Sequence, residues 1–305
     1  MRILLTGSTG FIGSHVARQL LHEGHIVRAH FLQGDDLSRI LDIQDRLQLV
    51  EGNLFNATEN RLAELCEGMD ACIHCAWYAV PGKYLASPEN LRCAHGSARL
   101  FAKLGEVGCK RLVGIGTCFE YDCDYGLLSE TTPTKATSLY AAAKTSTCLL
   151  GEQLAKIYGM TFAWARLFYL FGPHEDPRRL VPFVVNALLR GEKAGITSGH
   201  QIRDFLHVED TASAIIAVAQ HDCRGPINIG SGFPVTVREV VSLLAELLGR
   251  TDLIDFGTRP TNATDPPFVC ADNSKLRAVT DWKPRYDLRT GLAKTVECLK
   301  EHLQT

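Results

Sequence analysis

Short apolar runs alternate along the chain with longer stretches in which apolar residues recur every three or four positions. A short run bounded by turn residues predicts a buried strand, and the longer repeat predicts an amphipathic helix. Because strands that alternate with helices form parallel sheets with right-handed crossovers, the pattern predicts an α/β fold with a doubly wound parallel sheet. The predicted strands are residues 2–7, 25–31, 47–54, 71–77, 111–117 and 161–167, and the predicted helices include residues 14–24, 90–108, 138–159 and 239–249.

The amino-acid composition of the chain changes after Gly172. Proline and charged residues gather in "GPHEDPRRLVPF", "TRPTNATDPPF" and "DWKPRYD", which is typical of loops. We expect the sheet domain to comprise residues 1–172, with residues 203–231 returning to it. Residues 173–202 and 232–305 are then expected to form a smaller C-terminal α/β lobe whose loops contact the substrate.

The composition favours a globular protein that binds neither nucleic acid nor membranes. A formal net charge of -2 over 305 residues offers no general attraction for polyanions. Met1 is followed directly by the first predicted strand, which leaves no room for a secretion signal, so we expect a cytoplasmic protein. The 11 cysteines are scattered in apolar surroundings, which indicates reduced thiols. The "CIHC" segment that begins at Cys72 lies in a predicted strand without a second ligand pair, so we expect no metal site.

Three glycines follow the first predicted strand at the spacing of a phosphate-binding turn. Residues 6–13 read "TGSTGFIG", with the order G-x-x-G-x-x-G between a strand and a helix. Gly7 permits the tight turn, Gly10 lets backbone amides approach a pyrophosphate, and Gly13 lets the helix pack closely on the strand. An ordinary glycine turn is the alternative, but the position between the first strand and its helix favours dinucleotide binding.

The end of the second predicted strand bears on the choice of dinucleotide. Domains that prefer NAD usually place an acid there to hold the ribose hydroxyls, but this chain has Phe31. Asp35 and Asp36 follow in the loop and could serve instead, while Arg28 and Arg39 could bind a 2′-phosphate. The sequence therefore slightly favours NADP(H) as the cofactor, with NAD(H) as the alternative.

A tyrosine and a lysine in residues 138–159 indicate the chemistry. Tyr140 and Lys144 are four residues apart and therefore share one helix face. Thr137 or Ser138 can cap this helix, and Gly159 can end it. A nearby ammonium favours the phenolate and lowers the pKa of the tyrosine, which allows Tyr140 to exchange a proton with a substrate oxygen. A surface tyrosine beside a solvated lysine is the alternative, but a dinucleotide turn in the same chain favours catalysis.

With these motifs the chain resembles the extended short-chain dehydrogenase/reductases of the NAD(P)-dependent epimerase/dehydratase group, which act on nucleotide-activated sugars. The resemblance spans essentially all 305 residues, and it implies a Rossmann domain that binds the cofactor and a smaller lobe that binds the sugar nucleotide. The matching motifs are "TGSTGFIG" (6–13), "GNL" (52–54), "IHCA" (73–76), "GT" (116–117), "YAAAK" (140–144), "RLFYLFGP" (166–173) and "RDFLHVED" (203–210).

The resemblance implies a role for each matching position. Thr117 takes the place of the serine or threonine that hydrogen-bonds the reacting substrate oxygen, Tyr140 is the acid/base, and Lys144 binds the nicotinamide ribose. Of the cofactor positions, Asn53 and Leu54 lie by the adenine. The cofactor-binding residues implied in this way are Gly7, Thr9, Gly10, Phe11, Ile12, Phe31, Asn53, Leu54, Ala76, Tyr140 and Lys144.

The substrate positions follow from the same resemblance. Arg203 and Arg259 correspond to arginines that grip the diphosphate of the sugar nucleotide, a role that suits bidentate guanidinium contacts. Tyr169 stands where many epimerases of this group have an asparagine that touches the nucleotide, so we expect altered substrate contacts.

Departures from the family pattern narrow the choice of reactions that we expect the protein to catalyse. Dehydratases of the group carry "TDE", but the acidic positions are occupied here by Cys118 and Phe119, which cannot remove water. The favoured reaction is reduction of a 4-keto-6-deoxyhexose sugar nucleotide, with Tyr140 as the acid. An NAD-dependent 4-epimerase needs the same residues and is the alternative. A non-catalytic dinucleotide-binding regulator is a second alternative, which the survival of Thr117, Tyr140 and Lys144 disfavours.

The resemblance also implies a homodimer. In this group, the helices that match residues 90–106 and 138–158 pair between subunits as a four-helix bundle.

Overall fold

A large parallel sheet organises the computed structural model, which describes residues 1–261 and 265–304. Each neighbouring pair of its strands is parallel, which confirms the expected doubly wound α/β fold. Across the sheet, the seven strands found in the described residues are β11 (Gly225–Ile229), β7 (Thr161–Leu167), β5 (Arg111–Thr117), β4 (Ala71–His74), β1 (Arg2–Thr6), β2 (Ile26–Phe31) and β3 (Gln48–Glu51).

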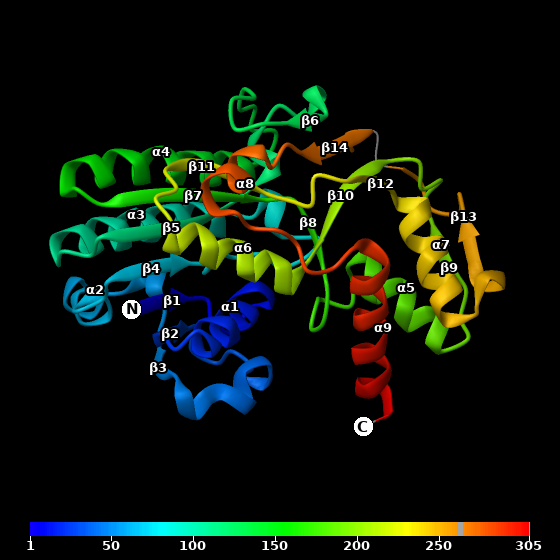
Figure 1. Ribbon diagram of the computed structural model, residues 1–305, viewed down its shortest axis with the longest axis horizontal. Coiled ribbons are helices and arrows are strands. Elements are labelled where there is room, and N and C mark those ends of the chain that lie inside the picture. Colours follow the sequence, from blue (N-terminus) through cyan, green and yellow to red (C-terminus); the bar gives the residue numbers. More distant parts are fainter. Residues whose placement is uncertain (262–264, 305) are drawn as a thin grey trace.

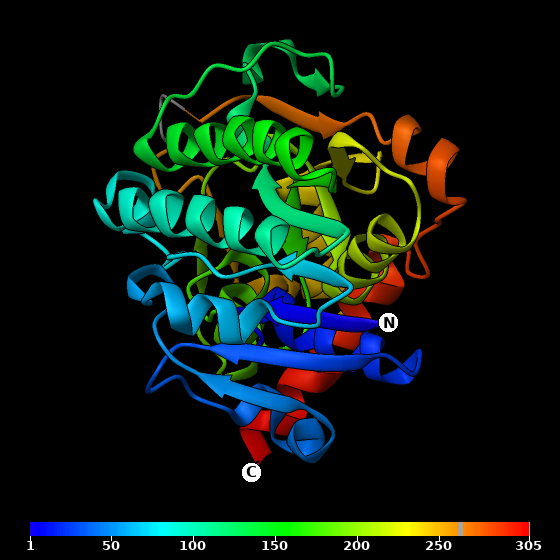
Figure 2. The same cartoon turned by 90° about the vertical axis from the view of Figure 1, so that its left-hand side faces the viewer.

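Helices cover both faces of this sheet (Figure 1). Because successive side chains of a strand point to opposite faces, Ile3 and Leu5 of β1 pack into one apolar core and Leu4 packs into another. Figure 2 shows two of the covering helices, α3 (Glu89–Glu106) and α4 (Leu139–Tyr158), side by side. The first core lies under α1 (Phe11–His22) and α6 (Val208–Gln220), and the second under α2 (Glu59–Cys66), α3 and α4.

Helix α4 begins and ends where its sequence predicts. The Ser138 hydroxyl accepts a hydrogen bond from the Ala141 N–H at 3.1 Å, which satisfies one of the unpaired amides of the first turn. Gly159 ends the helix in the left-handed conformation, with φ of 65°. These two caps fix the register of α4, and the first turn of the helix places Tyr140 next to the end of β5.

A second lobe is built around a smaller sheet and an apolar helical core. Within residues 203–231, which the sequence assigns to the sheet domain, β10 joins the smaller sheet while α6 and β11 pack with the large one. The sheet has the order β12 (Pro234–Thr236), β10 (Ile202–His207), β14 (Phe268–Ala271) and β6 (Leu127–Leu128), and β8 (Tyr169–Phe171) also pairs with β10. The other elements of this lobe are β9 (Ala194–Ile196), β13 (Ile254–Phe256), α5 (Leu180–Leu189), α7 (Val237–Leu248) and α9 (Leu288–Gln304), whereas α8 (Ser274–Thr280) packs against β11 of the large sheet and against α6.

Short 3-10 helices occupy several of the connections. They are η1 (Ser38–Arg46), η2 (Leu54–Asn56), η3 (Tyr84–Ala86), η4 (Cys118–Glu120), η5 (Cys123–Tyr125) and η6 (Thr251–Leu253). Among the described residues, no helix has the length and apolar content needed to cross a membrane. The same part of the chain contains no group of three His, Cys, Asp or Glu residues that could hold a metal ion.

Four buried histidines make the stability of the fold sensitive to acid. Burial lowers the pKa of His15, His30 and His207 to about 4, and that of His74 to about 3. In the unfolded chain a histidine titrates near its ordinary pKa of about 6.5. The unfolded state therefore binds more protons below that pH, so the contribution of each neutral ring is complete above pH 6.5 and is lost as the pH falls toward the folded pKa.

We therefore expect urea unfolding to become easier between pH 7.5 and pH 5, with His74 responsible for about 2 kcal/mol of the loss. His74 lies between the Thr6 and Ser97 hydroxyls, at 2.7 and 2.8 Å. A His74→Gln variant has no titrating ring, so its free energy of unfolding should change less over this pH interval. An equal pH dependence in wild type and variant would contradict the assignment.

Candidate active site

A cleft of about 640 Å³ lies at the carboxyl ends of the large sheet's central strands, and it extends into the second lobe. The carboxyl edge of a doubly wound sheet is where such folds bind their ligands. The cleft brings together most of the site residues predicted from the sequence. Its lining includes Gly7, Gly10, Phe11, Ile12, Thr117, Tyr140, Lys144, Tyr169, Arg203 and Arg259.

The glycine turn is shaped so tightly that side chains cannot replace its glycines. Gly7 has φ of +69°, and a Cβ built on it would lie 2.7 Å from the Ala76 nitrogen. A Cβ on Gly13 would lie 2.0 Å from the Gly7 carbonyl oxygen. Directly after this turn, α1 begins with its first amides at the cleft. This cradle fits the pyrophosphate of a dinucleotide, because unpaired amides and the helix dipole attract anions.

Two opposite charges flank Thr9 at this end of the cleft. The Thr9 hydroxyl donates to the Asp35 carboxylate at 2.6 Å, and the Arg39 guanidinium donates to the Thr9 carbonyl at 3.3 Å and to the His174 carbonyl at 3.2 Å. Arg39 lines the cleft, whereas Arg28 lies elsewhere and donates to three carbonyl groups at the end of α2. Of the two arginines considered for a 2′-phosphate, Arg39 is therefore the one in position.

The other predicted cofactor residues lie beside the cleft or away from its lining. Phe31 is buried at the end of β2. Ala76 packs against Gly7, and its N–H donates to the Thr6 hydroxyl at 3.2 Å. Asn53 is exposed and accepts a hydrogen bond from the Phe55 N–H, and Leu54 is buried in the core under α2 and α3.

The Tyr140 and Lys144 side chains both reach the cleft from one face of α4, as their spacing predicts. Lys144 is 3% exposed, and its ammonium donates to the Ile115 carbonyl at 2.6 Å. The same nitrogen lies 3.7 Å from the centroid of the Trp77 ring and 5.9 Å from that of the Tyr140 ring. Carbonyl and aromatic face together hold the cation in place.

The electrostatics of this pair differ from the expectation. Burial is the largest cause that raises the pKa of Tyr140 well above 10, with Tyr84 and Glu120 adding to the rise, while a hydrogen bond with Thr117 opposes it. Burial also lowers the pKa of Lys144 to about 7, against the attraction of Glu120. The expectation that Lys144 lowers the pKa of Tyr140 toward neutrality is therefore wrong for this structure. Burial destabilises the phenolate more than the nearby groups stabilise it. The direction of this shift favours the protonated phenol of Tyr140.

Thr117 ends β5 beside Tyr140 and starts η4. Its hydroxyl oxygen accepts from the Phe119 N–H at 3.3 Å, and its own N–H donates to the Glu120 carboxylate at 2.8 Å. Cys118 and Phe119 line the cleft, as their matches in dehydratases imply, but neither carries a carboxyl group. The cleft is therefore lined here by a hydroxyl and a phenol.

An aromatic loop before α3 covers Tyr140 and Lys144. The rings of Tyr84 and Trp77 stand edge-on to the Tyr140 ring, with centroids 4.8 and 6.4 Å away. Asn90, which is fully buried, accepts from the Trp77 indole at 2.8 Å and donates to the Tyr84 carbonyl at 2.6 Å. The sequence signal for this arrangement is the asparagine at the start of α3, which fixes the loop that precedes it.

The far end of the cleft carries the predicted arginines. Arg203 is 2% exposed and pairs with Asp265 at 2.7 Å, and its guanidinium lies 5.2 Å from the centroid of the Tyr169 ring. Arg259 is exposed and lies over the Phe183 ring at 4.2 Å. The structure therefore places cations at one end of the cleft and the glycine turn at the other.

A half-buried acid in the cleft, Glu175, was missed by the sequence analysis. Glu175 lines the cleft, and its Oε2 is buried without a hydrogen-bond partner among the described residues. Burial raises the pKa of this carboxyl to about 8, although Arg179 opposes the shift. Nothing in its sequence context "GPHEDP" distinguishes Glu175 from the exposed acids of a loop.

Comparison with known proteins identifies the family to which the chain is similar. The model of the NAD dependent epimerase/dehydratase family matches residues 3–230. An uncharacterized UDP-glucose epimerase of Bacillus subtilis, YtcB, is 28% identical over 100% of this chain and 99% of its own length. The structure of a UDP-glucose 4-epimerase with UDP-glucose from Thermotoga maritima has a TM-score of 0.89 and 26% identity, and covers 99% of this chain and 100% of its own. The structure of MoeE5 in complex with UDP-glucose and NAD has a TM-score of 0.86 and 30% sequence identity, and covers 99% of this chain and 100% of its own.

Proposed function

The chain belongs to the NAD dependent epimerase/dehydratase family, and from this premise we propose that it is an oxidoreductase of nucleotide-activated sugars that reduces the 4-keto group of a 6-deoxyhexose. The observation that carries the oxidoreductase assignment is the convergence of Thr117, Tyr140 and Lys144 in one cleft between the glycine turn and the arginines, and the apolar lining near Tyr140 is what favours the reductase. A sugar nucleotide would lie with its diphosphate near Arg203 and its ring near Tyr140.

The proposed reaction uses a small number of side chains. The nicotinamide, when bound, supplies the hydride. The Tyr140 phenol donates its proton to the carbonyl oxygen of the sugar, a direction that agrees with its raised pKa. The Thr117 hydroxyl donates a hydrogen bond to the same oxygen and stabilises the charge that develops on it. Lys144 stands behind the phenol and compensates its charge after the proton has left.

The walls of the cleft near Tyr140 support a sugar without a 6-hydroxyl group. Trp77, Tyr84, Cys118 and Phe119 line this part of the cleft, and Cys118 is a buried thiol whose pKa burial raises far above neutrality. A hydroxyl placed against these side chains without a partner costs about 1–3 kcal/mol. A 6-methyl group avoids this cost, and the absence of carboxyl groups at positions 118 and 119 disfavours a 4,6-dehydratase.

A 4-epimerase is the second candidate, because YtcB and the Thermotoga maritima protein are named epimerases. The same Tyr140 would then accept a proton and return it. One experiment separates the two. Purified protein is denatured and the released nucleotide identified, and fresh protein is then assayed with UDP-glucose and with 4-keto-6-deoxyglucose linked to dTDP, CDP, UDP or GDP. Oxidation of reduced cofactor with a keto sugar, read as falling absorbance at 340 nm, supports the reductase.

Tightly bound NAD together with the interconversion of UDP-glucose and UDP-galactose would instead establish the epimerase. Absence of turnover with every sugar nucleotide, despite cofactor binding, would leave only the regulator and would overturn the proposal.

We propose NADP(H) as the cofactor. We expect Arg39→Ala to weaken the binding of NADPH by roughly 10–100-fold relative to the binding of NADH. Loss of a guanidinium contact to a phosphate costs about 1.5–3 kcal/mol. Titration of protein fluorescence with each cofactor gives the ratio of dissociation constants. Arg28→Ala is the matched control, because its guanidinium is bound to carbonyl groups outside the cleft. Tighter binding of NADH, lost in Asp35→Ala, would show that the carboxylate beside Thr9 selects NAD.

We also propose a homodimer through α3 and α4, which leave four large apolar side chains exposed: Leu91, Leu149, Leu150 and Ile157. Leu149→Lys should convert the dimer to a monomer in light scattering after size exclusion, because a buried lysine ammonium is costly. Leu41→Lys is a matched control, since Leu41 is as exposed as Leu149, at 59%, but lies on η1. A monomeric wild-type protein would contradict the proposal.

A further inference from the structure

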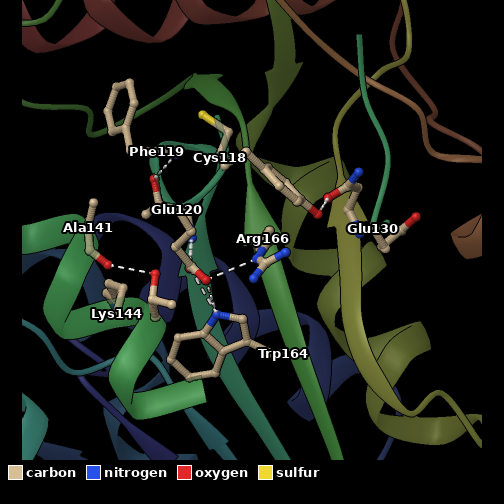
Figure 3. A network of polar contacts seen from close by, with 12 residues as sticks. Cys118, Phe119, Glu120, Glu130, Ala141, Lys144, Trp164 and Arg166 are labelled. Carbon is tan, nitrogen blue, oxygen red and sulfur yellow. Dashed lines mark hydrogen bonds and ion pairs between the residues drawn. The ribbon is translucent and has the colours of Figure 1, made fainter. Parts of the chain in front are cut away.

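A fully buried carboxylate lies next to the catalytic threonine. Glu120 is 0% exposed, and the dashed lines in Figure 3 join its carboxylate to Trp164 and Arg166. The Thr117 N–H donates to Oε1 at 2.8 Å, the Trp164 indole lies 2.9 and 3.0 Å from the two oxygens, and the Arg166 Nε lies 2.9 Å from Oε2. Burying a charge is expensive unless such partners compensate it.

The bond between Glu120 and Thr117 is one half of a reciprocal cap. The Thr117 hydroxyl oxygen accepts from the backbone of η4, while the Glu120 carboxylate accepts from the Thr117 N–H. Together the two bonds fix both the backbone and the side chain of Thr117. Because its oxygen already accepts from Phe119, the hydroxyl hydrogen is left to be donated toward Tyr140 and the cleft.

We propose that Glu120 is a positioning residue of this enzyme, which holds the Thr117 hydroxyl at the reacting oxygen of the substrate. The inference rests on the proposed function in one respect, namely that Thr117 contacts that oxygen. Arg166 and Trp164 hold the carboxylate from behind, so the position of Thr117 depends on side chains of β7 that lie outside the cleft lining.

A purely structural ion pair is the competing interpretation, and Glu120→Gln distinguishes the two. Glutamine has the shape of glutamate, but one of its terminal atoms is a donor, whereas Thr117, Trp164 and Arg166 are all donors toward this group. We expect Thr117 to shift and kcat to fall on the order of 30-fold, because a misplacement of about 1 Å can cost ~10²-fold. The KM values for cofactor and sugar nucleotide should stay within about threefold.

The decisive readout is a double-mutant cycle with Thr117→Ala. If Glu120 acts through Thr117, then Glu120→Gln should lower kcat by less than about threefold in the Thr117→Ala background. Glu130→Gln is the matched control, since Glu130 is an acid that accepts from the Asn228 N–H and does not line the cleft. Its kcat should stay within about twofold of wild type.

A second variant guards against misfolding of Glu120→Gln, which leaves the Arg166 charge uncompensated. Glu120→Leu/Arg166→Met removes both charges and the acceptor for Thr117, and replacing a buried pair in this way is often neutral for stability. The same cycle is then measured with it. Equal losses of kcat with and without the Thr117 hydroxyl, or no loss at all, would overturn the proposal. Wild-type protein without any sugar-nucleotide turnover would instead refute the proposed function and remove the basis of this one.

Discussion

Replacement of Tyr140 by phenylalanine is expected to lower kcat on the order of 10³-fold and to leave the dissociation constants of the cofactor within about threefold. The phenol is the proton donor of the proposed reaction, and general acid catalysis contributes about 10²–10⁴-fold. The ring itself packs edge-on against Tyr84 and Trp77, and phenylalanine keeps these contacts. Binding and folding should therefore survive while proton transfer fails, which separates catalysis from affinity.

The measurement is a kinetic assay at saturating cofactor, combined with a cofactor titration. Tyr158→Phe is the matched control, because Tyr158 is the last residue of the same helix and lies away from the cleft lining. It should retain full activity. More than about a tenth of wild-type kcat in Tyr140→Phe would mean that another group donates the proton, and Glu175, the half-buried acid of the cleft whose pKa is raised, would be the next candidate.

Gly13→Ala is expected to weaken cofactor binding on the order of 100-fold. The new methyl group would meet the Gly7 carbonyl oxygen at 2.0 Å and the Ser8 Cα at 3.0 Å. Both are backbone atoms of the turn, so the turn or helix α1 must move. Its amides then leave the position that suits a pyrophosphate, and each lost bond to a charged group costs about 1.5–3 kcal/mol. Overpacking of this kind also destabilises a fold by about 1–3 kcal/mol.

Titration with cofactor and thermal unfolding would be measured in parallel. Ser14→Ala, the neighbouring position on α1, is the control: it removes only the hydroxyl that donates to the Phe11 carbonyl at 3.2 Å. It should change affinity by less than about threefold. Undiminished affinity in Gly13→Ala would show that the dinucleotide does not use this turn.

The large sheet could be predicted from the sequence because both of its faces are buried. A strand such as β5 contributes Val113 and Ile115 to one core and Leu112 to the other, so it reads as an unbroken apolar run. The smaller sheet could not be predicted, because β6 and β8 are two and three residues long and carry no periodic signal. From the sequence, residues 203–231 are expected to return to the sheet domain, but the strand at their start, β10, pairs with β8, β12 and β14, and these non-local pairings carry no signal in the sequence.

The residues of the site also fall into a group that the sequence predicts and a group that only the tertiary structure brings together. The glycine turn and the Tyr140–Lys144 pair could be predicted because their chemistry depends on spacing within one element. Trp77 and Tyr84 are brought to Tyr140 by tertiary contacts, which no spacing encodes. Glu120 stands between these cases, because Thr117 and Glu120 form the S/T-x-x-E pattern of a capping box. That pattern is visible in the sequence, but the burial that gives it significance is not.

The polar contacts behind the active site also constrain how the cleft can open. From Glu120 they continue through Arg166, which lies 4.3 Å from the centroid of the Tyr121 ring, to the Tyr121 hydroxyl, which donates to Asn228 at 2.7 Å. Asn228 in turn donates to the carbonyls of Leu128 and Asp272, next to the smaller sheet. This buried chain of contacts ties the residues behind the cleft to both sheets. We therefore expect this side of the cleft to stay in place. Any change in the shape of the cleft on ligand binding is then expected to fall on the Trp77–Tyr84 loop and the segment around Glu175, which line the cleft outside this chain of contacts.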